Sequence, residues 1–534
     1  MRIQRKTLLV FLALIVVPIV AAYAQWAAFG LPSVAAQAAT PRDVAAPTGF
    51  PAWLRVTHYV NLFFLLLLVR SGLQILVDHP RLYWNVHCTP GTEWLRLTPI
   101  EVPADRVWTA KDDARRLSPW IGLPGYRHTV GMARHWHFLS VLFWVGNGVV
   151  LVFLLFGTGQ WRRLVPTSWM IIPEAWSYFV YYATFHMPPE PNGFYRYNAL
   201  QQLAYFSTIF VLAPLAIVTG PSMSPAFTNR FPWYPKAPGN RQIGRSLHFL
   251  VMVAFVVFTI VHVAMVCATG LVRNMNHIVV GADDGRPLGL YLGALGLVVV
   301  VAFNGLANWA AWRRPRMIQH LAAAIVTPIM KLLFGGVAPA AEFPRDQVSP
   351  FFWPNGKKPT SDEWTSMNAG GFKDYRLKIY GLVENPVELS LDEIRSMGAA
   401  SQVTLHHCIQ GWSGVAAWRG LPTSTLMELV RPRPEARRAV FYSFGEGLEG
   451  GAYYDSHTIE DLGHPQSILA YEMNDEPLGE LYGAPLRLRV ENQLGFKMVK
   501  WVRAVEFVAS HKDFGEGEGG YNEDHEYFGE LANI

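Results

Sequence analysis

Cysteine is scarce in this sequence, with three residues in a chain of 534. Cys88, Cys267 and Cys408 lie in segments of very different composition, so a disulfide framework is not expected. The N-terminus lacks a twin-arginine pair, and nothing there predicts the export of a folded, cofactor-loaded domain. The net charge of +5 is modest and indicates no nucleic-acid partner.

Charge is almost missing from six apolar stretches. Each is long enough for a helix to cross the ~30 Å hydrocarbon core of a bilayer. They are residues 7–24, 56–77, 136–156, 199–219, 248–271 and 288–312. After about residue 340 charged residues become frequent, and Pro and Gly interrupt the short apolar runs. The sequence therefore predicts a multidomain, multi-pass membrane protein, with an all-α transmembrane bundle followed by a soluble domain.

Basic residues flank these stretches unevenly. If Arg2, Arg5 and Lys6 stay in the cytoplasm, six crossings also leave residues 78–134, 220–247 and 313–316 there. These segments hold eight, four and three Lys or Arg, against two, three and two in the opposite segments 25–56, 157–198 and 272–287. The positive-inside rule thus predicts a cytoplasmic soluble domain. A periplasmic soluble domain is the alternative if the first stretch, whose "AAYAQ" resembles a cleavage site, is not embedded with its N-terminus inside.

Four histidines lie in the predicted spans, where ionisable side chains are costly and functional by default. His248 and His262 are 14 residues apart, so they project from one helix face roughly 21 Å apart. Alternating spans bring His137 level with His248 and His58 level with His262. His135 competes with His137 but points in another direction. Two stacked imidazole pairs are what two six-coordinate b haems need, although a lone membrane histidine is as often a helix-packing hydrogen bonder.

Three segments carry a family resemblance: "SGLQILVDHPRLYW" (71–84), "GMARHWHFLSVLFWVGNGVVLVF" (131–153) and "YNALQQLAYFSTIFVLAPLAIVTGPSMSP" (197–225). They resemble the bacterial di-haem cytochrome b561 family, which includes membrane subunits of formate dehydrogenases, nickel–iron hydrogenases and thiosulfate reductases. The resemblance implies two b haems on the four histidines and electron exchange with a membrane quinone. Arg70, about 18 Å beyond His58 by helical rise, either pairs with a haem propionate or extends to the membrane surface.

The soluble part alternates short strand-like and helical segments. Strands are predicted in "YRLKIYGLV", "QVTLHHCI", "RRAVFYSF", "PLRLRV" and "VKWVRAVEFV", and helices in "LSLDEIRSM" and "PTSTLMELVRP". This pattern is typical of a mixed α+β domain. Cys408 follows one of the strands and has three possible roles. It is a small buried hydrophobe, a nucleophile with His406 or His407 as base, or a thiolate ligand of a metal that a cofactor also holds.

Three ordered motifs decide among these roles: "LHHCIQGWSGVAAWRGLP" (405–422), "LAYEMNDEPL" (469–478) and "GAPLRLRVENQLGFKMVKWVRAVEF" (483–507). They look like the oxidoreductase molybdopterin-binding domain of the sulfite oxidase fold. The resemblance implies that Cys408 binds molybdenum beside a pterin. It also implies that the pterin is held by five residues, namely Ser443, Arg487, Met498, Val499 and Lys500. Adjacency suggests His407 and Gln410 for the substrate side. Related methionine-sulfoxide-reductase catalytic subunits have Glu at the position of Gln410 and Asn at that of Tyr482.

Together the two halves predict a membrane oxidoreductase. Electrons would pass between quinone, two b haems and a molybdenum–pterin centre that performs oxygen-atom transfer on a small substrate such as sulfite or a sulfoxide. The alternative is a haem-b electron-transfer protein whose soluble domain only docks a further redox partner. The predicted domains are 1–49 (first span or signal, and linker), 50–320 (di-haem cytochrome), 321–344 (linker), 345–510 (molybdopterin domain) and 511–534 (acidic, Gly-rich and mobile tail).

Overall fold

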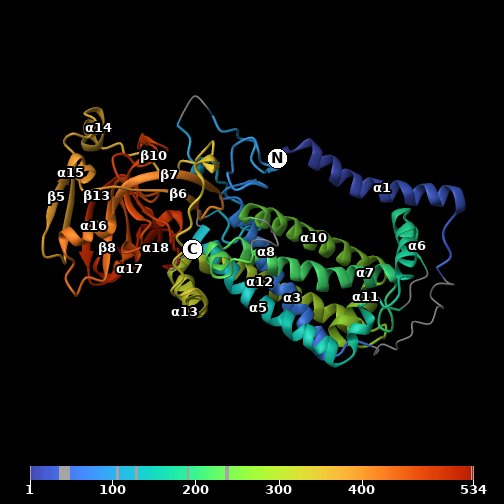
Figure 1. The fold of residues 1–534 in the computed structure, drawn as a ribbon. Helices are drawn as coiled ribbons and strands as arrows, with labels where there is room; N and C mark the ends of the chain where they lie inside the picture. Colours follow the sequence, from blue (N-terminus) through green and yellow to red (C-terminus); the bar gives the residue numbers. More distant parts are fainter. Residues whose placement is uncertain are drawn as a thin grey trace.

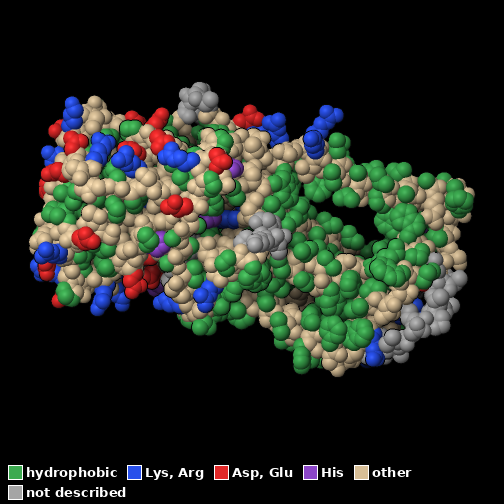
Figure 2. All heavy atoms as spheres, in the orientation of Figure 1, with side chains coloured by type: hydrophobic (Ala, Val, Ile, Leu, Met, Phe, Trp, Pro, Cys, Tyr) green, Lys and Arg blue, Asp and Glu red, His purple; other side chains and the backbone are tan. Residues whose placement is uncertain are grey.

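The computed structural model describes residues 2–34, 49–103, 107–126, 130–188, 192–234, 240–530 and 532, so parts of the predicted segments 1–49 and 511–534 lie outside it. A helical half and a sheet-rich half pack end to end (Figure 1). Figure 2 shows apolar side chains over the helical half and interspersed charges over the other. The predicted class, an all-α membrane bundle followed by a mixed α+β domain, is confirmed.

Seven helical segments among the described residues are long and apolar enough to span a membrane. They are α1 (Arg5–Phe29), α3 (Ala52–Leu76), α5 (Val130–Gly157), the continuous Ala199–Ser222, α10 (Arg241–Ala268), α12 (Leu288–Arg313) and α13 (Pro315–Phe334). Ala199–Ser222 consists of α7 (Ala199–Ser207), a π-helical turn (Thr208–Leu212) and α8 (Ala213–Ser222). Six of the seven coincide with the predicted stretches.

The seventh helix, α13, was not predicted, and the segment expected as a linker, 321–344, is helical as far as Phe334. It begins directly after α12 ends, at the end of the bundle that faces the sheet-rich half (Figure 1). Its last residue packs against Phe227 of α9 (Pro225–Arg230), which follows α8 at the same end. Because both ends of α13 lie on one side of the bundle, this helix does not cross the bundle from end to end.

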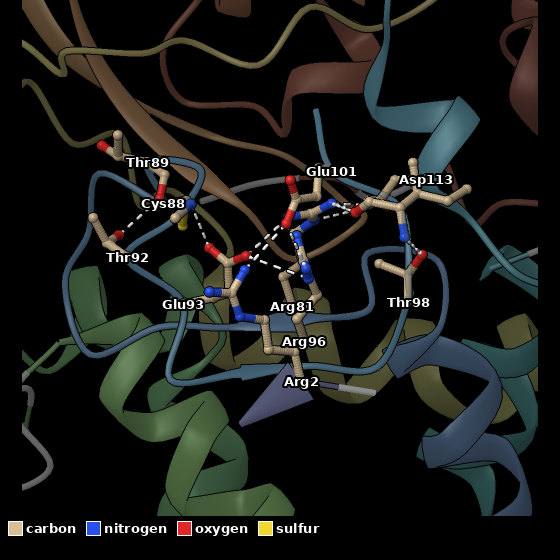
Figure 3. A network of polar contacts seen from close by, with 12 residues as sticks. Arg2, Arg81, Cys88, Thr89, Thr92, Glu93, Arg96, Thr98, Glu101 and Asp113 are labelled. Atoms are coloured by element: carbon tan, nitrogen blue, oxygen red, sulfur yellow. Dashed lines mark hydrogen bonds and ion pairs between the residues drawn. The ribbon is translucent and has the colours of Figure 1, made fainter. Parts of the chain in front are cut away.

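The N-terminus and the sheet-rich half lie at the same end of the bundle (Figure 1). Strand β1 (Arg2–Ile3) pairs with β3 (Leu95–Arg96), which also pairs with β2 (Arg81–Leu82). Both partner strands belong to the segment between α3 and α5. Figure 3 shows the polar network that holds this segment. In it, the buried Arg81 donates to Glu93 (3.0 Å) and to Asp113 (2.6 Å).

Two five-stranded sheets form the soluble half. In one, the order is β11-β10-β7-β6 with β12 also on β10; in the other it is β5-β4-β13-β8-β9. The second sheet is mixed, because β13 runs parallel to β4 and antiparallel to β8. The strands are β4 (Arg376–Gly381), β5 (Val387–Ser390), β6 (Ala400–His407), β7 (Ser413–Pro422), β8 (Arg438–Glu446), β9 (Ala452–Thr458), β10 (Ser467–Met473), β11 (Glu476–Pro477), β12 (Arg487–Val490) and β13 (Val502–Val508).

Short helices lie before and between these strands. They are α14 (Asp362–Ala369), α15 (Leu391–Ser396), α16 (Thr423–Val430) and α17 (Ile459–Leu462). Ser390 caps α15 in a capping box with Glu393, which explains why this helix begins directly after β5. Four fully buried tryptophans lie in the core, which is continuous across both sheets: Trp353, Trp364, Trp412 and Trp418.

The acidic C-terminal segment is not a mobile tail, as its composition suggested. It forms α18 (Tyr521–His525), and Tyr521, Glu523 and Asp524 are buried. Lys497 donates to the Asp455 carboxylate at 2.6 Å and also to Glu523. An internal cation therefore neutralises part of the acidic charge that predicted disorder.

Candidate active site and metal centres

The helical bundle brings the four predicted histidines together in two pairs. The ring centroids of His137 and His248 are 6.3 Å apart, and those of His58 and His262 are 6.4 Å apart. Two imidazoles that share one metal at the usual ~2 Å N–metal distance have centroids roughly 6 Å apart. Each pair thus has the separation that one six-coordinate iron requires. His137 and His248 lie at the end of the bundle that faces the sheet-rich half.

Hydroxyl groups contact one ring nitrogen of three of these histidines. Nδ1 lies 3.1 Å from Ser71 Oγ in His137, 2.9 Å from Thr219 Oγ1 in His248, and 3.5 Å from the Tyr205 hydroxyl in His262. A second hydrogen bond of this kind is what orients a metal-binding imidazole and leaves Nε2 for the metal. The Nδ1 of His58 is buried and has no hydrogen-bond partner among the described residues.

His135 and Arg70 point elsewhere. His135 Nε2 lies 2.8 Å from the backbone oxygen of Tyr527, in the C-terminal segment. Arg70 faces α12, where it donates to the side-chain oxygens of Asn304 and Asn308, both at 2.6 Å, and to the carbonyl of Pro119 at 2.5 Å. The Arg70 guanidinium thus lies between α12 and the loop around Pro119, at the end of α3, where amide and carbonyl oxygens bind it. Both expected roles of Arg70 stay predictions.

Cys408 directly follows strand β6 and is almost fully buried. A tight loop returns the chain to β7, with Cys408 N–H donating to the Trp412 carbonyl at 3.1 Å and Gly411 N–H donating to the Cys408 carbonyl at 3.1 Å. Gly411 has φ +112°, a conformation that favours glycine. Burial raises the pKa of the Cys408 thiol to about 12. The thiol therefore stays protonated at neutral pH unless a metal displaces the proton.

Cys408 lines a cavity that is partly open to solvent and holds about 930 Å³ of empty space when the solvent at its mouth is included. Five of the predicted site residues line it with Cys408: Gln410, Ser443, Arg487, Met498 and Lys500. Gln410 Oε1 lies 3.7 Å from Cys408 Sγ, and its Nε2 donates to the Asp78 carbonyl at 3.2 Å. Val499 is in the core instead, where its carbonyl accepts from Leu488 N–H at 2.8 Å.

His407 does not line this cavity, contrary to the prediction. Successive side chains of a strand point to opposite faces, so His406 shares the side of Cys408 and His407 faces a second cavity between α8, α9 and β6. His406 Nδ1 lies 3.0 Å from Arg489 Nη1. Burial, and then the Arg489 charge, lower the pKa of His406 well below its usual value, so this ring is neutral. The alternation of β6 could have identified His406 from the sequence.

Two buried basic side chains at the cavity could hold an anionic group, although burial, and then the Arg487 charge, lower the pKa of Lys500 well below its usual value. Arg487 donates to the Tyr482 carbonyl at 3.2 Å, and its Nε has no hydrogen-bond partner among the described residues. Lys500 donates to the Leu481 carbonyl at 2.8 Å and to that of Asn355. Neither forms an ion pair in the part of the chain that the structure describes. Because an unpaired buried charge is costly, these residues suit the phosphate of a pterin cofactor.

The Cys408 loop is bonded directly to the helix that carries His248. Asn240 caps α10 by accepting from Gln242 N–H (2.9 Å), and the next two side chains reach the loop. Arg241 donates to the carbonyls of Cys408 (3.1 Å) and Trp412 (3.3 Å), and Gln242 donates to the Gly411 carbonyl (2.9 Å). The first turns of α10, from Arg241 to His248, thus connect the Cys408 loop to the histidine pair of His137 and His248.

Comparison with known families agrees with this geometry. The family model described as "Prokaryotic cytochrome b561" matches residues 49–279, and that described as "Oxidoreductase molybdopterin binding domain" matches residues 365–514. The chain joins a prokaryotic cytochrome b561 domain to an oxidoreductase molybdopterin-binding domain. The predicted recognition of both parts is therefore confirmed.

Curated relatives match parts of the chain. A "Putative protein-methionine-sulfoxide reductase subunit YedZ1" of Azospira oryzae is 32% identical over 166 residues, which is 31% of this chain and 58% of the relative. A "Protein-methionine-sulfoxide reductase catalytic subunit MsrP" of Xanthomonas campestris pv. campestris is 29% identical over 25% of this chain and 45% of the relative. The chain thus spans about half the length of these relatives.

Proposed function

We propose that this chain is a membrane-bound oxidoreductase that passes electrons between a quinone, two b haems and a molybdenum–pterin centre on Cys408. The observation that carries the proposal is the contact between the first turn of α10 and the Cys408 loop. Arg241, which bonds the Cys408 carbonyl, precedes His248 by seven residues on this helix, which is about 10.5 Å of helical rise. A haem on His137 and His248 would lie close enough to the cavity to exchange electrons within the chain.

In this proposal the four histidines bind the haem irons through Nε2. Ser71, Thr219 and Tyr205 orient three of the rings through Nδ1. The 14 residues between His248 and His262 separate the two haems by roughly 21 Å along α10, so together they cover most of the bilayer. The far haem would exchange electrons with the quinone.

In the soluble half, Cys408 would supply the thiolate ligand, and Arg487 and Lys500 would hold the pterin phosphate. Ser443 and Met498 line the same cavity. When bound, the molybdenum–pterin group supplies two-electron oxygen-atom transfer. The buried thiol, with its raised pKa, must lose a proton when the metal binds, so loading of the site releases a proton.

A sulfoxide is the substrate class that we favour over sulfite. Two curated relatives that match parts of this chain carry names of methionine-sulfoxide reductase subunits. Sulfoxide reduction consumes two electrons and two protons and releases water, and the haems would supply the electrons one at a time. The charge distribution around the spans supports a cytoplasmic molybdenum domain. The periplasmic arrangement is the alternative and needs the opposite orientation of the whole bundle.

The test is purification in detergent, with metal analysis and a reduced-minus-oxidised spectrum. We expect two b haems and one molybdenum per chain. Cys408→Ser should abolish sulfoxide reduction and leave the haem spectrum intact. The exposed Cys267→Ser serves as the matched control and should change neither. Protein that purifies from molybdenum-sufficient cells with haem but no molybdenum would instead indicate an electron-transfer protein with a docking domain.

A further inference from the structure

One wall of the Cys408 cavity is not built by the molybdopterin-binding domain. Lys111 comes from the segment between α3 and α5, in the membrane half. Asn522, Glu526 and Phe528 come from the C-terminal segment, beyond the matched residues 365–514. Two charged side chains of opposite sign, Lys111 and Glu526, thus reach the cavity from outside the domain that holds Cys408.

Lys111 is held in place by its own short helix, α4 (Ala110–Asp113). Thr109 and Asp112 form a capping box at its start, and Ala110 N–H donates to the Pro354 carbonyl at 2.9 Å. At its end, the fully buried Asp113 accepts from Arg81 Nε at 2.6 Å, as Figure 3 shows. These contacts fix the backbone on both sides of Lys111, so its ammonium group is positioned rather than free to turn into solvent.

Glu526 is fixed just as firmly by the C-terminal segment. Its N–H donates to the Asn522 carbonyl at 2.9 Å, and Gln319 of α13 donates to the carbonyls of Glu523 (3.0 Å) and Phe528 (2.7 Å) on either side. The Glu526 side chain is only 5% exposed; its Oε2 forms an ion pair with Lys111 but accepts no hydrogen bond from the described residues. A buried carboxylate oxygen that lines a cavity and lacks a donor requires one from a ligand or from water.

The two charges are close but not in hydrogen-bond contact, with 3.7 Å between Lys111 Nζ and Glu526 Oε2. A phosphate on Lys111 would meet the Glu526 carboxylate, whereas Arg487 and Lys500 have no such neighbour in contact. A ligand with only an anionic group is therefore disfavoured here, and so is one with only a cationic group. A ligand that carries both charges a few ångströms apart can satisfy both side chains.

We propose that Lys111 and Glu526 form a recognition subsite for a zwitterionic substrate, namely a free amino-acid sulfoxide. Lys111 binds the α-carboxylate and Glu526 binds the α-ammonium, while the sulfoxide oxygen points towards Cys408. The inference rests on the proposed function and adds a substrate class to it. It also means that the molybdopterin-binding domain alone has an incomplete substrate site, because the membrane half and the C-terminal segment supply the subsite.

The experiment compares two substrates on the full-length, haem-loaded protein. One is free methionine sulfoxide, and the other is N-acetyl-methionine sulfoxide methylamide, which has the same sulfoxide and neither charge. We expect kcat/KM to favour the free amino acid in the natural protein. The ratio of the two kcat/KM values should fall tenfold or more in Lys111→Met and in Glu526→Gln, mainly through KM, because each loses a charge-assisted hydrogen bond. Lys373→Met, at an exposed lysine of the soluble half, should leave the ratio of the two kcat/KM values unchanged.

A binding measurement separates this inference from the proposed function. Calorimetric titration with methionine sulfone, which is not reduced, should give a Kd that rises tenfold or more in Lys111→Met and in Glu526→Gln. The haem spectrum reports that each variant is folded. Equal kcat/KM for the two sulfoxides in the natural protein, or an unchanged sulfone Kd in both variants, would overturn the subsite. Failure to reduce either sulfoxide, with sulfone binding dependent on Lys111, would overturn the proposed sulfoxide reduction and leave the subsite standing.

Discussion

The histidine pairs predict that the two haems can be removed one at a time. His58→Ala should abolish the pair with His262, and His137→Ala the pair with His248. The pairs are separated by 14 residues of α10, roughly 21 Å by helical rise. Sites farther apart than about 7–10 Å that share no partner usually behave independently. Each single variant should therefore keep one of two haems, and the double variant should keep none.

The assay is a pyridine haemochrome measurement per protein chain, together with the α-band of the reduced spectrum. The expected haem content relative to the natural protein is about half for each single variant, since one of two independent pairs remains. His135→Ala is the matched control. His135 precedes His137 by two residues and contacts the Tyr527 carbonyl instead of a histidine. The variant should therefore keep both haems. Loss of all haem in either single variant, or full retention in both, would refute the assignment of two bis-histidine sites.

Three further predictions address the junction, the orientation and the thiol. Gln242→Leu removes the side-chain amide that donates to the Gly411 carbonyl and to Ser413 Oγ. Reoxidation of the reduced haem by substrate, measured by stopped flow, should therefore slow about tenfold. An unchanged rate would argue against this contact as part of the electron-transfer route. For a cytoplasmic molybdenum domain, an impermeant maleimide should label Gly285→Cys but not Lys373→Cys in intact spheroplasts of a Cys267→Ser background, and the reverse would indicate the periplasmic arrangement. In cofactor-free protein, alkylation of Cys408 should be slow at pH 8 and rise about tenfold per pH unit towards pH 11, because its pKa is raised to about 12 and only the thiolate reacts; a rate independent of pH would contradict that shift.

Patterns that repeat along the chain predicted most of the fold. Six apolar stretches became six helices, and the 14-residue spacing of His248 and His262 predicted which rings would meet on the neighbouring helices. Five of the ten strands of the soluble half were predicted for the same reason, since alternation and turn residues are local signals; they are β4, β6, β8, β12 and β13. Cys408 needed more than a local signal, because a lone cysteine has no spacing, and only the family resemblance suggested a role for it.

Residues whose position depends on distant parts of the chain were predicted poorly. Arg70 binds Asn304 and Asn308, more than 230 residues away, and nothing near Arg70 indicates those partners. The C-terminal segment has the composition of a mobile tail, but Lys497 and Gln319 bind it. His407 was a different kind of error. It was chosen because it precedes Cys408, although the period of two in a strand assigns the cavity to His406.

The junction between the halves has consequences for how electrons would reach Cys408. Buried polar contacts hold it, including Gln410 Nε2 to the Asp78 carbonyl (3.2 Å) and Ser413 Oγ to the Val86 carbonyl (2.7 Å), in addition to the bonds from Arg241 and Gln242. Separating the halves would leave these donors and carbonyls unpaired until water reached them, at about 1–3 kcal/mol for each buried group. The contact is therefore permanent on the timescale of turnover. Under the proposed function, electron exchange between haem and molybdenum needs no docking step, and its rate should not depend on protein concentration.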